Sequence, residues 1–144
     1  MTLDEIFSLW EKDSVIDRLE LSNSSLDTPK LHHKYLRIYS AENIRLKKME
    51  QDANVLYKLK TEYYIGTLDQ ETMKERGWEP NALKILKADL PTYIKADTDI
   101  INSNLALGLQ KEKVSVLESI LKTIANRGFA IKNAIDYIKF QAGE

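Results

Sequence analysis

The longest stretch of this chain without a helix-breaking residue runs from Pro29 to Gly66, and it is the strongest constraint on the fold. No glycine or proline lies between these two residues. Either Asp27 or Thr28 can cap the first turn, and Pro29 fits there because the backbone N–H that it lacks has no partner within the helix. The stretch therefore predicts one helix of about 35 residues, roughly 50 Å long at 1.5 Å per residue.

This predicted helix carries a seam of apolar residues at three- and four-residue steps, which Glu42 interrupts. The seam consists of Leu31, Tyr35, Ile38, Leu46, Met49, Ala53, Leu56 and Tyr63. A helix of this length in a chain of 144 residues cannot bury its apolar stripe alone. We therefore expect an all-α fold in which long helices pack into a bundle or an oligomer.

The rest of the chain is expected to form one domain with this helix. Leu3, Ile6, Phe7 and Trp10 recur at helical spacing and predict a short amphipathic helix that ends near Asp13. A polar loop or hinge is expected at residues 22–25. The predicted parts are 1–26 (N-terminal helix and hinge), 27–66 (long basic helix), 67–96 (connector) and 97–144 (a long helix and a C-terminal helix).

The predicted connector and the final helices depend on a few signals. Asn81 can cap a short helix through Leu86 that Pro91 ends, and a short extended segment is expected at residues 92–96. Asp97 or Asp99 then caps a long helix in which Gly108 is the weak point, and a last helix follows Gly128. The apolar side of the last helix includes Phe129, Ile131, Ala134, Ile135 and Ile138.

Charge is unevenly distributed, although the net charge is only −1. Residues 1–29 hold seven acids and two bases, residues 30–60 hold three acids and eight bases, and residues 61–144 hold twelve acids and eleven bases. One segment therefore carries most of the local positive field, which is what phosphate binding requires. The alternative interpretation is an ordinary solvated helix face.

The basic segment ends in two lysines and several tyrosines just before Gly66. A lysine can neutralise a phosphate and a tyrosine ring can stack on a base, the combination found in single-strand binders. Candidate contacts to single-stranded DNA are Lys58, Lys60, Tyr57, Tyr64, Arg45, Lys47 and Lys48. Because Lys58 and Lys60 are two residues apart, they face nearly opposite sides of one helix. Packing is the favoured role for Tyr63 and Trp78.

Several classes of chemistry lack residues to support them. The chain contains no cysteine, no Gly-rich phosphate loop, and no Ser nucleophile with spaced His and Asp partners. His32 and His33 are neighbours and cannot share a metal as an i, i+4 pair would. We therefore expect no enzyme activity, no cofactor and no metal. The acidic N-terminus and the lack of a long apolar window predict a cytosolic protein.

Two motifs together resemble the UvsY recombination mediators of T-even-type phages. The sequence Lys58-x-Lys60-x-Glu62-Tyr63-Tyr64-x-Gly66 is similar to the family's Lys-x-Arg followed by Asp-Tyr-Tyr-x-Gly. The sequence Arg127-Gly128-Phe129-Ala130-Ile131-Lys132, with the tail Phe140-Gln141-Ala142-Gly143-Glu144, resembles the family's C-terminal end. The motifs share one order and similar spacing. Lys60 stands where the family often has Arg, which keeps a point charge but gives up the bidentate fork.

The resemblance implies a mediator that binds single-stranded DNA as a homo-oligomeric ring, a hexamer or a heptamer. It implies two further partners, a RecA-like phage recombinase and the phage single-strand-binding protein, in the cytoplasm of the infected bacterial host. By motif position, Lys58 and Lys60 take the DNA-contacting role, and the helix after Arg127 takes the assembly role. An alternative function is a helical scaffold or coiled-coil adaptor that does not bind nucleic acid.

Overall fold

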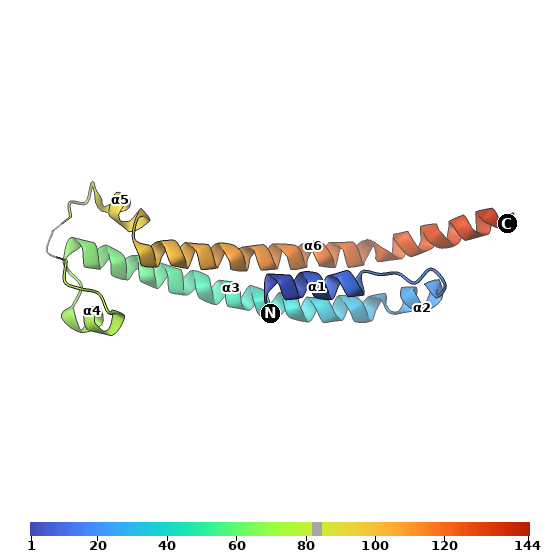
Figure 1. The fold of residues 1–144 in the computed structure, drawn as a ribbon, viewed down its shortest axis with the longest axis horizontal. Helices are drawn as coiled ribbons and strands as arrows, with labels where there is room; N and C mark the ends of the chain where they lie inside the picture. The colour runs from blue at the N-terminus through green and yellow to red at the C-terminus, as the bar shows by residue number, and fades with distance from the viewer. Residues whose placement is uncertain (82–84) are drawn as a thin grey trace. The chain divides into compact units, whose positions relative to one another are not determined.

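The computed structural model describes residues 1–81 and 85–144, and within these ranges all regular structure is helical. The helices in chain order are α1 (Leu3–Asp13), α2 (Leu21–Leu26), α3 (Thr28–Ile65), α4 (Gln70–Arg76), α5 (Leu90–Lys95) and α6 (Thr98–Gln141), shown in Figure 1. The expectation of an all-α fold is therefore confirmed.

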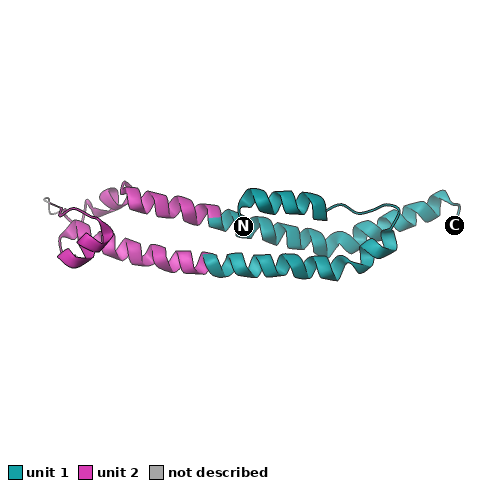
Figure 2. Ribbon diagram, turned by 60° about the horizontal axis from the view of Figure 1, so that its bottom comes forward, with its two compact units in different colours: residues 1–45, 110–144 teal, residues 46–109 magenta. Residues whose placement is uncertain are grey.

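The helices belong to two compact units, coloured separately in Figure 2. The first unit comprises residues 1–45 and 110–144, and the second comprises residues 46–109. Each of the two long helices, α3 and α6, contributes one segment to each unit.

The core of the first unit forms where α1, α3 and α6 pack together. Its buried residues are Ile6, Tyr35, Leu117, Ile120 and Ile124. The Trp10 ring meets the Tyr35 ring edge-on, with centroids 5.3 Å apart, which is a favourable geometry for two aromatic quadrupoles. The first part of the apolar seam predicted on α3, namely Leu31, Tyr35 and Ile38, thus packs in this core with residues of α1 and α6.

The predicted bounds of α1 and α3 agree with the structure. Thr2 and Glu5 form a capping box at α1, in which each side chain bonds the other residue's backbone N–H. Helix α3 begins at Thr28 and ends at Ile65, just before Gly66, whose φ of 84° lies in the left-handed region.

The predicted loop at residues 22–25 is wrong, because these residues lie in the short helix α2. The Asn23 side-chain amide donates to the Glu20 carboxylate, and the Ser24 N–H donates to the Glu20 carbonyl oxygen. These local bonds satisfy polar groups that the prediction assigned to an irregular loop.

The predicted connector also differs from the structure. Part of the helix predicted after Asn81 lies outside the described residues, and Ile85 and Leu86 are not helical. Pro91 starts a helix instead of ending one, since it occupies the first turn of α5, where its missing N–H costs nothing. The prediction of an extended segment at residues 92–96 is also wrong, because most of these residues lie in α5.

The last two predicted helices form one continuous helix, α6, which passes through both Gly108 and Gly128. The buried residues Leu117, Ile120, Ile124, Arg127 and Ile131 follow one another at three- and four-residue steps across Gly128. Their shared face keeps α6 packed, and this outweighs the low helix propensity of a single glycine.

Replacing Gly128 by Ala should therefore raise the free energy of unfolding by about 0.5–1 kcal/mol, because alanine has the higher helix propensity. A Cβ at this position meets no heavy atom within 4 Å. Urea denaturation followed by circular dichroism measures the change. Gly77→Ala is the matched control and should destabilise, because the φ of Gly77 is +70°. A destabilising Gly128→Ala would contradict a continuous α6.

Candidate nucleic-acid interface

The two lysines of the Lys58-x-Lys60 motif lie in opposite environments in the second unit. The Lys58 side chain is 77% exposed, and its ammonium lies 3.8 Å from the Glu62 carboxylate one turn further along α3. The Lys60 side chain is only 5% exposed. The two side chains point to nearly opposite sides of α3, as predicted, because two residues correspond to a helical rotation of about 200°.

Lys60 is held by two carboxylates and two aromatic rings. Its Nζ atom lies 3.1 Å from an Asp97 oxygen and 2.9 Å from an Asp99 oxygen. The same atom lies 3.9 Å from the centroid of the Trp78 ring and 5.3 Å from that of the Tyr63 ring. Both geometries are within range for a cation–π interaction.

The prediction that Lys60 contacts DNA therefore does not fit this structure. Its ammonium is already neutralised, and a phosphate could reach it only if Trp78 and both carboxylates moved. We call Lys60, Asp97, Asp99, Tyr64 and Trp78 the Lys60 cluster. It connects α3, the segment after α4 and the start of α6 within the second unit.

Hydrogen bonds complete the Lys60 cluster. The Tyr64 hydroxyl donates to Asp97, and the Trp78 indole N–H donates to Asp99 over 3.0 Å. Asp97 also accepts a bond of 3.1 Å from the Ile100 N–H, so the predicted cap at the start of α6 is confirmed. Tyr64 and Trp78 are thus engaged in packing and hydrogen bonding in this structure, which leaves Tyr57 as the exposed ring.

The ionisation of the Lys60 cluster follows from these contacts. Burial by itself would raise the pKa of Asp97, but hydrogen bonds from Tyr64 and Ile100 and the Lys60 ammonium outweigh burial and lower that pKa. Burial, followed by the hydrogen bond to Asp97, raises the pKa of Tyr64 above its usual range. Asp97 is therefore a carboxylate and Tyr64 a neutral phenol at neutral pH.

The other predicted DNA contacts on α3 are exposed. Arg45, Lys47 and Lys48 project from the helix, and so does Tyr57 beside Lys58. Among the residues that the structure describes, none of Arg45, Lys47 and Lys48 forms an ion pair. Lys47 and Lys58 differ by about 20° in helical rotation, so these two cations share one face of α3 about 16 Å apart along the axis.

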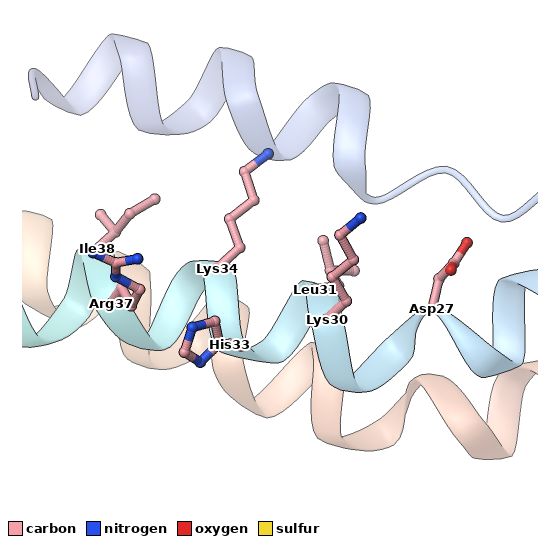
Figure 3. A pocket seen from close by; sticks show the side chains of 7 residues that line it. All are labelled: Asp27, Lys30, Leu31, His33, Lys34, Arg37 and Ile38. Carbon is pink, nitrogen blue, oxygen red and sulfur yellow. The ribbon is translucent and has the colours of Figure 1, made fainter.

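A second basic area, which the sequence analysis did not single out, lies in the first unit. A groove of about 640 Å³ runs along the first turns of α3 (Figure 3). It is lined by Asp27, Lys30, Leu31, His33, Lys34, Arg37 and Ile38. The Lys34 ammonium is paired with the Asp13 carboxylate at 2.6 Å. Lys30 and Arg37 form no ion pair within the described ranges 1–81 and 85–144. The excess of bases in residues 30–60 was the available signal for this groove.

The predicted assembly residues on α6 divide into exposed and buried ones. Phe129 and Ile138 are 70% and 50% exposed, and the Phe140 side chain is exposed beyond them. Ala134 and Ile135 are half-buried. The prediction that Ile131 contacts a second copy is wrong. Ile131 is buried and packs within its own chain. The exposed residues remain available as an apolar surface.

The described part of the chain shows neither a membrane-spanning helix nor a cluster of metal ligands. No described helix is both long and apolar enough to span a bilayer. No group of three or more metal-ligating side chains gathers there either.

A family model, a related sequence and solved structures all point to the same family. A family model described as the recombination, repair and ssDNA binding protein UvsY matches residues 9–144. The recombination protein uvsY of Enterobacteria phage T4 is 26% identical over 144 residues, which is the full length of both chains.

Solved structures that match include crystal structures of the bacteriophage T4 recombination mediator protein UvsY. One, in lattice type II, has a TM-score of 0.85 at 25% identity and covers 99% of this chain and 98% of that one. Another, in lattice type IV, has the same TM-score and identity and covers 97% of this chain and 99% of that one.

The structural role of the Lys60 cluster predicts unequal effects of its two neighbouring lysines on stability. Lys60→Ala should lower the free energy of unfolding by about 3–5 kcal/mol, because it leaves a buried carboxylate without its cation. Lys58→Ala is the matched control and should leave stability unchanged within error, since the exposed pair that it breaks is weak. Chemical denaturation of both variants makes the comparison. Equal effects of the two substitutions would contradict the burial of Lys60.

The lowered pKa of Asp97 predicts loss of stability in acid. Because the pKa is lower in the folded state, the Asp97 carboxylate stabilises the fold above its unfolded pKa of about 3.9. That stabilisation is lost as the pH falls through the folded pKa. Unfolding free energies of the native chain and Asp97→Asn should therefore differ at pH 6 and converge toward pH 3. A difference that does not change with pH would contradict this assignment.

Proposed function

This chain belongs to the UvsY family, and on that premise we propose that it is a recombination mediator that binds single-stranded DNA. In this proposal, several copies form a ring that wraps the strand. The ring weakens the hold of the phage single-strand-binding protein and promotes loading of a RecA-like recombinase. The protein acts by binding, without catalysis or a cofactor, in the cytoplasm of the infected bacterial host.

The observation that carries the proposal is the exposed basic face of α3 in the second unit. Lys47 and Lys58 share this face, and Lys48 and the exposed Tyr57 ring lie beside it. Two cations about 16 Å apart can meet phosphates several nucleotides apart, and Tyr57 offers a surface for a base. Lys60 supports the face from within, because its cluster fixes the end of α3.

The groove in the first unit provides a second place for phosphate. Lys30 and Arg37 project there without carboxylate partners among the described residues, and His33 adds a hydrogen-bond donor. We propose that the groove extends the DNA contacts of each copy. None of the described residues that line the groove is Phe, Tyr or Trp, so we assign its contribution mainly to phosphate.

Assembly supplies the affinity that one copy lacks. The net charge of each copy is −1, so a single copy has no overall electrostatic attraction to a phosphate chain. When several copies join, their sites act on one strand at high effective concentration, so weak contacts add to strong binding. The exposed Phe129, Ile138 and Phe140 on α6 are the surface that we assign to contact between copies.

The alternative is a helical scaffold or adaptor whose basic face is only solvated. Both functions require self-association, so oligomerisation does not separate them. Binding of single-stranded DNA does, because the scaffold has no reason to bind a strand in a salt-dependent manner.

The test is fluorescence anisotropy with labelled single-stranded DNA across a salt series. The plot of log affinity against log salt should have a slope of about −0.7 for each phosphate neutralised. Lys47→Ala combined with Lys58→Ala should weaken binding and make the slope shallower by about 1.4 for each copy that contacts the strand, because each copy loses two contacts. Absence of binding by the native chain at low salt would leave the scaffold as the better explanation.

Two further variants locate the binding surface. Lys122→Ala removes an exposed cation of α6 outside the proposed surfaces and should bind like the native chain. Lys30→Ala combined with Arg37→Ala should also weaken binding if the groove takes part. A loss of affinity as large in Lys122→Ala as in the α3 variants would mean that only total charge matters.

A further inference from the structure

Arg127 is a buried cation without a counter-ion in the first unit. Arg127 is 9% exposed, and its Nε atom is buried with no hydrogen-bond acceptor among the residues that the structure describes. One Nη atom lies 3.5 Å from the Asp13 carbonyl oxygen, at the outer limit of a hydrogen bond. Within the described ranges, Arg127 forms no ion pair. This differs from Lys60, which has two carboxylates.

The carboxylate of Asp13 does not neutralise Arg127. It accepts a bond of 2.6 Å from the Lys34 ammonium and one of 3.0 Å from the Tyr35 hydroxyl. A guanidinium cannot lose its proton at any physiological pH, so it cannot escape the cost of burial by becoming neutral. An unpaired buried charge is costly, which means that an anion supplied from outside would be bound favourably.

A pocket of about 270 Å³ opens beside Arg127. It is lined by Trp10, Ser14, Ile16, Thr123, Asn126, Arg127 and Ala130. Ser14 and Thr123 already donate their hydroxyl hydrogens to the carbonyl oxygens of Glu11 and Ser119. The other N–H donors among the lining side chains are the Arg127 guanidinium, the Asn126 amide and the Trp10 indole, and the rest of the wall is largely apolar.

We propose that this pocket binds a carboxylate group. The guanidinium has a planar fork of N–H donors that matches the two oxygens of a carboxylate. The apolar wall of Trp10, Ile16 and Ala130 suits the carbon stem behind such a group. The volume holds an acidic side chain or a small dicarboxylic acid, whereas a DNA strand needs an open track for successive phosphates.

The carboxylate has two possible sources. One is an acidic side chain of a second copy of this chain, and this source rests on the self-association proposed above. The chain has acids to offer, because residues 1–29 hold seven of them against two bases. The other source is a free organic acid. Both place the same group against Arg127, and the experiment below separates them.

The first arm measures thermal unfolding in succinate, inorganic phosphate and chloride at equal ionic strength. Succinate should raise the melting temperature of the native chain by about 4 °C relative to chloride, because a ligand of the folded state stabilises it. Arg127→Met, which keeps the stem and removes the charge, should show no such rise. Lys122→Met is the matched control, since Lys122 is exposed on the same helix outside the proposed surfaces, and should respond like the native chain.

The second arm measures sedimentation velocity over a range of protein concentrations. If a second copy supplies the carboxylate, Arg127→Met should shift toward smaller species, whereas Lys122→Met should not. If the source is a free acid, the size distribution stays the same and only the succinate response is lost. Either outcome supports the carboxylate site.

The proposal is overturned if Arg127→Met and the native chain agree in both arms, or if phosphate stabilises the native chain and succinate does not. Should Arg127→Met not fold, Arg127→Lys keeps the charge without the fork and should show a weakened succinate response. Binding of single-stranded DNA is measured on the same samples. Suppose that the native chain binds DNA, that succinate does not stabilise it, and that Arg127→Met has the native size distribution. These results would exclude the carboxylate site without affecting the proposed function.

Discussion

The burial of the Lys60 ammonium is the interaction on which the second unit most depends. A lysine removed from water needs opposite charge close by, and Asp97 and Asp99 at the start of α6 supply it at 3.1 and 2.9 Å. Trp78 covers the cation with its ring and donates to Asp99. Three segments that are distant in sequence therefore meet at one charge, and the end of α3 is held in a fixed rotation.

That rotation decides which cations of α3 face the solvent. With Lys60 turned inward, Lys58 and Lys47 turn outward on the opposite side, where the Lys58 side chain is 77% exposed. The basic face and the buried cluster are thus two consequences of one helical period. A substitution in the cluster would disturb DNA binding indirectly, by releasing the end of α3, and loss of affinity alone would not identify a contact residue.

The sequence was sufficient for the features set by local chemistry. The glycine- and proline-free stretch predicted α3 to within a residue or two, and Asp97, one of the two acids predicted as a cap of α6, is the cap. Features set by tertiary contacts were missed. Asp97 and Asp99 are far from Lys60 in the sequence, and no sequence motif contains all three residues. Their pairing with Lys60 could therefore not be predicted. Gly128 and Pro91 were misjudged because each residue is compatible with two local structures and packing decides between them.

The exposure of the candidate cations on α3 was predicted more accurately than their partners. The excess of bases in residues 30–60 pointed to α3, and most of the named cations are exposed there. The groove around Lys30 and Arg37 was not predicted, because the motif of lysines and tyrosines lies at the other end of α3. Ile131 on α6 was misassigned for a similar reason. From sequence, an apolar residue that packs in the core of its own chain looks the same as one that contacts a second copy, and Ile131 is buried in its own chain.

Lysine accessibility tests the central claim most directly, namely that α3 buries Lys60 and presents Lys47 and Lys58 to the strand. Brief acetylation of the folded protein, with and without single-stranded DNA, would be followed by mass spectrometry of each lysine. The account predicts that Lys47 and Lys58 are modified freely and become protected by DNA, whereas Lys60 is unreactive in both samples. Modification of Lys60 in the free protein, with protection by DNA, would contradict the account and restore Lys60 as a direct contact.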